Sequence, residues 1–152
     1  MLIEGKKHAP ENLGRVLVLG LGKSGLAAVD YLLPLIGGRV ERLAIAAGTE
    51  NDASRQAAAR AEAAAAAVAF GDDAVAPLVD EAGPFDLCIA SPGISALSDF
   101  YRSAQAASAE LVSEVEFAWR ESDADSVWIA ITGTNGKTTT TSIVAHLLEQ
   151  AG

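Results

Sequence analysis

A turn near the end of the sequence has the residue types that bind a nucleoside triphosphate. Residues 132–139 read Thr-Gly-Thr-Asn-Gly-Lys-Thr-Thr and lie between an apolar run and a predicted helix. Glycines let successive backbone N–H groups point at phosphate oxygens, and the start of a helix adds partial positive charge. Lys137 would reach the terminal phosphates, and the Thr138 hydroxyl would ligate Mg²⁺. The pattern predicts a P-loop for ATP, formed by Gly133, Thr134, Asn135, Gly136, Lys137, Thr138 and Thr139.

The match to the usual P-loop pattern is incomplete at one position. The strict pattern has a glycine five residues before Gly136, and this chain has Ile131 there. The alternative is a strand-to-helix turn with an accidental Lys-Thr pair. The predicted strand before the turn and the predicted helix after it disfavour that alternative.

A second glycine-rich turn follows the first predicted strand. It reads Gly20-Leu21-Gly22-Lys23-Ser24-Gly25, a G-x-G-x-x-G run. Such glycines permit a tight turn, close approach to a diphosphate and close packing of a helix on a strand. The same run also occurs in turns that serve helix packing alone. Because it directly follows a continuous apolar strand, we favour a diphosphate site at Gly20, Leu21, Gly22, Lys23, Ser24 and Gly25.

The end of the second predicted strand disfavours a nicotinamide dinucleotide at this turn. Such a site needs an acidic residue there, about 20 residues after the glycines, to hold the ribose hydroxyls. The sequence has Ala46-Ala47-Gly48 instead, with Glu41 at the beginning of the strand and Glu50 beyond its end. Other diphosphate ligands remain open.

A third loop, Ser91-Pro92-Gly93, follows another apolar strand. Ligands of open α/β sheets lie at the carboxyl ends of the strands, where this loop is expected. Proline and glycine can also simply turn the chain. Both interpretations, a plain turn and a ligand-facing loop, stay open on the local sequence.

The elements that must position these loops alternate between strand and helix. Continuous apolar runs predict buried parallel strands, and an alanine-rich stretch with interspersed charges predicts a helix. This alternation predicts an α/β fold, a Rossmann-like doubly wound, mostly parallel sheet. The predicted strands are 15–20, 41–46, 68–70, 85–90 and 111–112, and the predicted helices are 24–32, 51–67, 74–81, 98–107 and 114–120, the last with Ser113 and Glu116 at the spacing of a capping box.

The last part of the chain predicts the beginning of a second domain. A polar linker over 121–125 precedes a predicted strand (126–131), the P-loop, and a helix (138–150). One strand and one helix cannot enclose a core. We therefore expect a first domain over 1–121 and, over 122–152, the first strand, P-loop and helix of a truncated second α/β domain. The apolar face of its helix, Ile143, Val144, Leu147 and Leu148, is expected to pack on the first domain or on a neighbouring chain.

Composition excludes several classes of protein. Twenty acidic residues against 11 basic ones give a net charge of -9, without a basic stripe for nucleic acid. No apolar run approaches the roughly 20 residues that span a bilayer, and no secretion signal begins the sequence. Cys88 is the only cysteine, so it cannot form an internal disulfide or a cysteine cluster for zinc, and a buried strand residue is expected. A cytoplasmic protein without a membrane or nucleic-acid partner is predicted.

Together, these loops resemble the Mur ligase family of peptidoglycan synthesis. Residues 132–139 resemble the family's ATP loop, which folylpolyglutamate synthetases share and which tolerates a residue such as Ile131. The resemblance extends over nearly the whole chain and is weakest over 41–73. Its more specific parts are similar to the member that adds D-glutamate, and they are residues 20–26, 29–31, 90–94, 113–117 and 127–139.

The resemblance implies an ATP-dependent acid–amino acid ligase whose substrates are UDP-N-acetylmuramoyl-L-alanine, D-glutamate and ATP with Mg²⁺. It implies that residues 21–25 lie near the UDP diphosphate, with Ser91, Pro92 and Gly93 in the same cleft and Thr49 as the candidate for uracil. ATP would phosphorylate the substrate carboxylate, Lys137 and Thr138 would be catalytic, and Thr138 would also bind the metal. The resulting acyl phosphate would be attacked by D-glutamate.

The resemblance also implies that this chain is an amino-terminal piece of a monomeric enzyme. Such a piece is expected to lack ligation activity, to bind ATP weakly and to self-associate through its truncated end. Two rivals remain open: a NAD-binding regulatory domain, and a standalone switch protein that uses its P-loop as a sensor. Another ligase of the Mur or folylpolyglutamate type is a further alternative.

Overall fold

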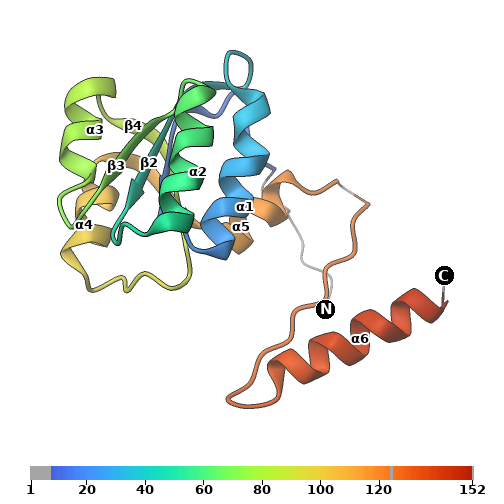
Figure 1. The fold of residues 1–152 in the computed structure, drawn as a ribbon. Helices are drawn as coiled ribbons and strands as arrows, with labels where there is room; N and C mark the ends of the chain where they lie inside the picture. The colour runs from blue at the N-terminus through green and yellow to red at the C-terminus, as the bar shows by residue number, and fades with distance from the viewer. Residues whose placement is uncertain (1–7, 124, 152) are drawn as a thin grey trace. The chain divides into compact units, whose positions relative to one another are not determined.

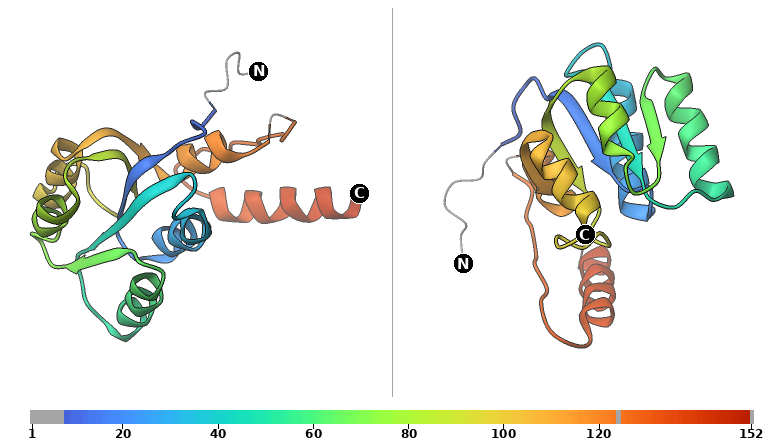
Figure 2. Two further views of the ribbon diagram at one scale, coloured as in Figure 1. Left: turned by 90° about the horizontal axis from the view of Figure 1, so that it is seen from above. Right: turned by 90° about the vertical axis from the view of Figure 1, so that its left-hand side faces the viewer.

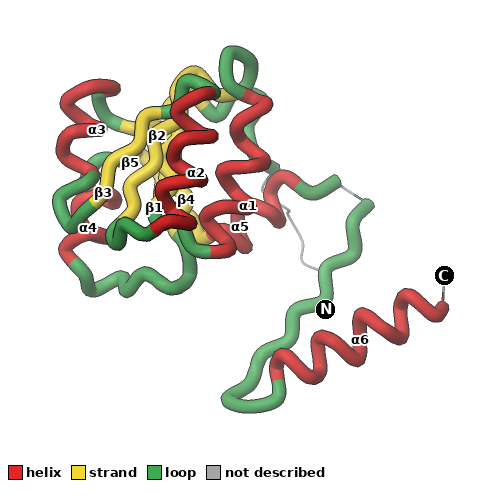
Figure 3. The backbone as a smooth tube through the Cα atoms, viewed as in Figure 1, coloured by secondary structure: helices red, strands yellow, loops and turns green. Residues whose placement is uncertain are grey.

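The computed structural model describes residues 8–123 and 125–151 and divides the chain into two compact units, residues 1–122 and 123–152. The first unit contains a five-stranded sheet in the order β3-β2-β1-β4-β5. Every neighbouring pair of strands is parallel. Figures 1 and 3 show this sheet with helices packed against it. The strands are β1 (Gly14–Leu19), β2 (Val40–Ala47), β3 (Ala67–Phe70), β4 (Phe85–Ala90) and β5 (Ser108–Ser113).

Helices cover both faces of this sheet (Figure 2). One core cluster joins alternate strand residues to α1 (Lys23–Leu32), α2 (Asp52–Ala63) and α5 (Glu114–Glu121). The other joins the opposite strand faces to α3 (Val75–Ala82) and α4 (Asp99–Ala106). Because both faces are buried, the strands read as continuous apolar runs. The Rossmann-like α/β fold predicted from the sequence is confirmed.

The strand order creates a switch point between β1 and β4. From β1 the chain proceeds to β2 and β3 on one side, and then crosses to β4 and β5 on the other. Loops that leave β1 and β4 at their carboxyl ends therefore diverge to opposite faces and open a crevice between them. The Ser91 amide, just after β4, donates to the Leu19 carbonyl at the end of β1 (3.0 Å). The two loops therefore start side by side.

One predicted helix end and one predicted helix cap differ from the structure for physical reasons. The alanine-rich helix was predicted to reach residue 67, but α2 ends at Ala63, and Ala65 has a left-handed φ of 66°. The Ser113 hydroxyl caps α5 by accepting from the Glu116 amide at 3.1 Å. Glu116 does not complete the predicted capping box, because its carboxylate pairs with Arg120 one turn later.

Cys88 is fully buried in β4, and burial raises the pKa of its thiol to about 12, so it is a packing residue.

The second unit consists of an extended segment, the glycine-rich turn and α6 (Lys137–Ala151). The strand predicted over 126–131 is wrong, because this segment has no ladder partner among the described residues. Its apolar side chains instead line a shallow groove with Val144 and Leu148 of α6. On α6, Val144 is half-buried, and Ile143 and Leu147 are 55% and 61% exposed. The packing of this face on the first domain or on a neighbouring chain stays a prediction. Within the described residues, no helix combines the length and the apolar composition needed to cross a membrane.

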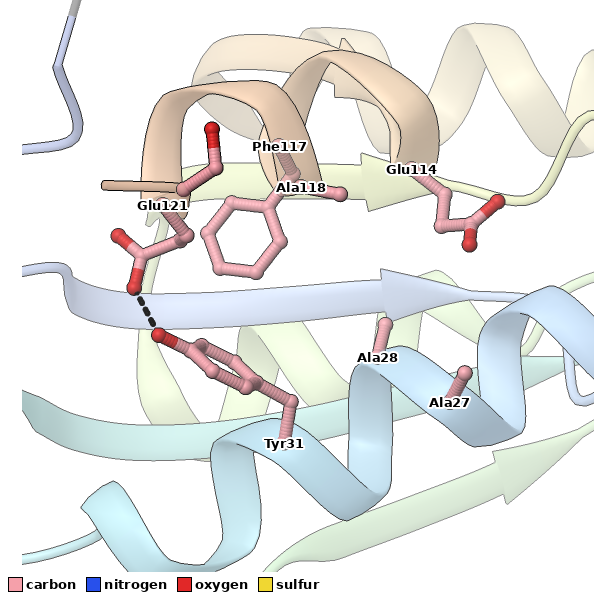
Figure 4. A pocket seen from close by; sticks show the side chains of 8 residues that line it. Ala27, Ala28, Tyr31, Glu114, Phe117, Ala118 and Glu121 are labelled. Atoms are coloured by element: carbon pink, nitrogen blue, oxygen red, sulfur yellow. Dashed lines mark hydrogen bonds between the residues drawn. The ribbon is translucent and has the colours of Figure 1, made fainter. Parts of the chain in front are cut away.

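A buried carboxylate ties together the elements at the amino edge of the sheet. Glu121, at the end of α5, accepts hydrogen bonds from Arg39 at 2.7 and 2.9 Å and from the Tyr31 hydroxyl of α1. Figure 4 shows Tyr31 and Glu121 at one end of a groove of about 290 Å³ between α1 and α5. Burial opposes ionisation of Glu121, but the hydrogen bonds from Arg39 and Tyr31 outweigh it and hold the pKa of the carboxyl below its ordinary value.

This lowered pKa makes the stability of the first unit depend on pH. A carboxyl whose pKa is lower in the folded state stabilises the fold above its unfolded pKa and loses that effect as the pH falls through the folded value. We expect Glu121→Gln to lower the free energy of unfolding by about 1.5–3 kcal/mol at pH 7, the usual range for hydrogen bonds to a charged group. Urea unfolding should show the difference from wild type shrinking as the pH falls below the ordinary pKa of a glutamate and through the lower pKa of folded Glu121. Glu62→Gln, the same change at an exposed position on α2, is the control and should leave the free energy of unfolding at pH 7 close to that of the wild type.

Candidate functional site

The glycine-rich turn after β1 packs α1 tightly onto the sheet. Gly20 has a φ of 96°, and its amide donates to the Ala46 carbonyl of β2 at 2.7 Å. A Cβ on Gly25 would lie 1.9 Å from the Gly20 carbonyl oxygen and 2.9 Å from Ser91 Oγ. The first and last glycines of the motif are therefore required by the backbone and by the approach of the helix.

The start of α1 presents backbone donors without internal acceptors. Gly22 is the N-cap residue and has no side chain to cap the helix. Among the described residues, the amides of Lys23, Ser24 and Gly25 donate to no recorded partner, and the first backbone bond of this helix runs from Leu26 to Gly22. Unpaired amides at a helix start attract anions. This end of α1 can hold a phosphate.

Open space lies over the middle glycine of the turn. Gly22 is exposed, and a Cβ built on it meets no heavy atom within 4 Å. Its φ of -72° is one that any residue can adopt. Gly22 is therefore not needed for folding, and the space above it is free for a ligand.

The loop after β4, which contains Ser91, Pro92 and Gly93, lies against this turn. Ser91 is buried, and its hydroxyl lies 3.5 Å from the Gly20 carbonyl oxygen. Pro92 and Gly93 are exposed. The structure thus brings residues 20–25 and 91–93 together at one crevice, although they are some 70 positions apart in the sequence.

Thr49 lies at the same edge of the sheet, in the loop after β2, but no hydrogen bond within residues 8–123 and 125–151 is recorded for its side chain. Thr49 is exposed, and only its carbonyl has a recorded bond, accepting from Ser54 Oγ at 3.4 Å. The loop itself is ordered by a reciprocal cap between Asn51 and Ser54 at the start of α2. The role predicted for Thr49 stays a prediction.

The acid required for NAD is absent from the end of β2. Ala46 and Ala47 are buried there, and Glu50, further along, is exposed and pairs with Arg55 at 2.8 Å. A carboxylate held by Arg55 beyond the strand end does not match the place where ribose hydroxyls are bound in such sites. The NAD-binding alternative stays open to test by titration.

The second glycine-rich turn forms the connection into α6. Gly133 and Gly136 have φ values of 156° and 77°. The Lys137 ammonium donates to the Gly133 carbonyl at 2.6 Å, so the lysine side chain folds back over the turn. Thr140 is the first residue whose amide bonds back to the turn, at Gly136, which leaves the Lys137, Thr138 and Thr139 amides without a recorded acceptor among the described residues. This turn therefore also presents donors and a cation in one place.

A metal ion could use few groups of the protein. No cluster of three or more His, Cys, Asp or Glu side chains suited to a metal exists in residues 8–123 and 125–151. The Thr138 hydroxyl has no recorded hydrogen bond to any of these residues. It can contribute one oxygen ligand, as the sequence predicts, with the remaining ligands coming from phosphate and water.

The sequence is similar to one group of enzymes. UDP-N-acetylmuramoylalanine–D-glutamate ligases of Gloeobacter violaceus, Thermobifida fusca and Shouchella clausii are 37%, 35% and 37% identical over 92%, 91% and 96% of this chain. The chain spans only 28–30% of the length of these relatives. No family model matches the chain.

Proposed function

This chain belongs to the family of the UDP-N-acetylmuramoylalanine–D-glutamate ligases, and we propose that it holds the UDP end of the substrate and begins the ATP site of such a ligase. The carrying observation is sequence identity of 35–37% over more than nine-tenths of the chain, combined with an open glycine turn at the switch point of the sheet. The reaction of the full-length protein, a step in making a peptidoglycan precursor in the cytoplasm, is part of this proposal.

We propose that the diphosphate of UDP-N-acetylmuramoyl-L-alanine binds at the start of α1. The unpaired amides of Lys23 and Ser24 and the open space over Gly22 support this placement. Pro92 and Gly93, exposed on the neighbouring loop, would line the opposite wall. Thr49 is the candidate to contact uracil, because the loop after β2 borders the same crevice.

We propose that ATP binds at residues 133–139, with its phosphates on the amides at the start of α6. Lys137 would exchange its bond to the Gly133 carbonyl for the terminal phosphates and neutralise part of their charge. The free Thr138 hydroxyl would be one ligand of Mg²⁺, which supplies further neutralisation of phosphate charge when bound. These groups fit a triphosphate. That the reaction consumes ATP is part of the same proposal.

The proposed reaction forms an amide bond in two steps. The substrate carboxylate attacks the γ-phosphorus of ATP, ADP leaves, and an acyl phosphate results. The amine of D-glutamate then attacks the acyl carbon, loses a proton and displaces phosphate. We propose this chemistry for the full-length ligase alone and expect none from residues 1–152 by themselves, since few groups here can bind a metal and positioning dominates such reactions.

Titration separates this proposal from the NAD-binding alternative. We expect the 152-residue chain to bind UDP-N-acetylmuramoyl-L-alanine in calorimetry and to leave the fluorescence of NADH unchanged. UDP alone should bind and compete with the sugar nucleotide, because the diphosphate is the anchored group. Binding of NADH without binding of UDP would reverse the assignment and favour a regulatory dinucleotide domain.

A further inference from the structure

The side chain of Ile94 lies against the first glycine of the turn after β1. A Cβ on Gly20 would come within 2.9 Å of Ile94 Cδ1, closer than the 3.1 Å that separates it from Ser91 Oγ. Ile94 thus occupies space that a side chain at position 20 would need. Ile94 follows the exposed Pro92 and Gly93 in the chain. An isoleucine has no polar group, so its residue type alone does not predict a ligand site.

Ile94 is held in this place by the backbone of its own loop. Its amide donates to the Ser91 carbonyl at 3.1 Å, and the Ser91 amide donates to the Leu19 carbonyl at 3.0 Å. The side chain of Ile94 is half-buried against the core cluster beneath α3 and α4. The turn over 91–94 is therefore fastened to the end of β1 and to the core at once.

We propose that Ile94 is a positioning residue for the diphosphate site, holding the Gly20 backbone so that the amides at the start of α1 face the ligand. This inference rests on the proposed binding of UDP at that turn. Glycine has the greatest backbone freedom and no side chain of its own to anchor it, so a turn that begins with Gly20 needs support from elsewhere. Donors fixed before binding avoid an ordering cost when the ligand arrives.

The branching of isoleucine suits this role. A β-branched side chain has few χ1 rotamers, so it transmits a fixed position better than an unbranched one. Ile94→Val keeps the branching and removes only Cδ1, the atom nearest the Cβ position of Gly20. Ile94→Ala removes the whole contact. The two variants form a graded series at one site.

The test combines UDP affinity with hydrogen exchange in the ligand-free chain. We expect the dissociation constant for UDP to rise about threefold in Ile94→Val and about tenfold in Ile94→Ala, because misplaced groups weaken pre-formed sites by such factors. Amide exchange at Gly20 and Leu26, which donate to the Ala46 and Gly22 carbonyls, should accelerate in the same order. Ile36 provides the matched control, since it is also half-buried against the core but precedes β2 at the opposite edge of the sheet.

The Ile36→Val and Ile36→Ala variants should lose thermal stability comparably and leave UDP affinity and exchange at Gly20 and Leu26 unchanged. If the Ile94 variants behave like the Ile36 variants in both measurements, Ile94 is a core residue only and the inference is overturned. If the wild-type chain does not bind UDP, the proposed function fails, while amide exchange at Gly20 and Leu26 still decides whether Ile94 orders the turn.

Discussion

Gly25→Ala is expected to destabilise the first unit more than any other single methyl addition in its crevice. The new Cβ would lie 1.9 Å from the carbonyl oxygen and 2.8 Å from the carbonyl carbon of Gly20. Both atoms are backbone, so a side-chain rotation cannot relieve the clash, and α1 must move away from β1. That movement opens the packing of Val29 and Leu32, which are buried against the sheet. We expect a loss of about 3 kcal/mol or more, the upper range for overpacked cores.

This loss is a large fraction of the roughly 5–15 kcal/mol that stabilises a typical domain. Thermal and urea unfolding followed by circular dichroism will measure it, and a midpoint lower by about 10 °C or more is expected from the usual relation between stability and melting temperature. Gly38→Ala is the matched control, because its Cβ would meet only an ordinary contact of 3.6 Å and its φ is not left-handed. A Gly25→Ala variant as stable as the Gly38→Ala variant would show that α1 does not pack as tightly as described.

The sequence predicts a strand correctly where a continuous apolar run also has a neighbouring strand to pair with. Phe85–Ala90 has the predicted bounds, because a continuous apolar run in a sheet covered on both faces has a single interpretation. The apolar run over 126–131 looks the same in sequence but forms no strand, because a strand needs a partner and none of the described residues pairs with it. In contrast, β5 begins at Ser108, well before the two residues predicted, because pairing with β4 recruits residues of weak strand propensity.

The candidate site could be predicted in part, and the limit is its dependence on strand order. The glycine spacing predicts the turn over 20–25, and the Ser-Pro-Gly sequence predicts a loop at the end of a strand. That these two loops meet follows only from β4 lying beside β1, which no local pattern reveals. Ile94 lies in the similar segment 90–94, but the sequence assigns it no role, because an apolar residue after a turn looks the same whether it supports a site or a core. Residues that act through backbone contacts leave no chemical signature.

Gly22→Val is expected to abolish UDP binding while leaving the fold intact, the opposite of the effect at Gly25. The valine would meet no protein atom within 4 Å at its Cβ, and the extended backbone at Gly22 (φ -72°, ψ -176°) suits a β-branched residue. Its side chain would project into the open space beside the unpaired amides at the start of α1. A diphosphate could then no longer approach the backbone closely, which is the reason for a glycine at this place in such turns.

The expected loss is at least about a hundredfold in affinity for UDP and for UDP-N-acetylmuramoyl-L-alanine, since hydrogen bonds to a charged group contribute about 1.5–3 kcal/mol each and at least two would be lost. Calorimetric titration measures this loss, and urea unfolding checks that stability stays within about 1 kcal/mol of the wild type, the effect expected of a changed N-cap. The two variants separate two roles of the glycine motif. Gly25 allows α1 to pack closely on the sheet, and Gly22 allows the diphosphate to approach the backbone. Undiminished affinity in a folded Gly22→Val chain would place the diphosphate elsewhere, and the exposed Pro92–Gly93 wall would become the first alternative.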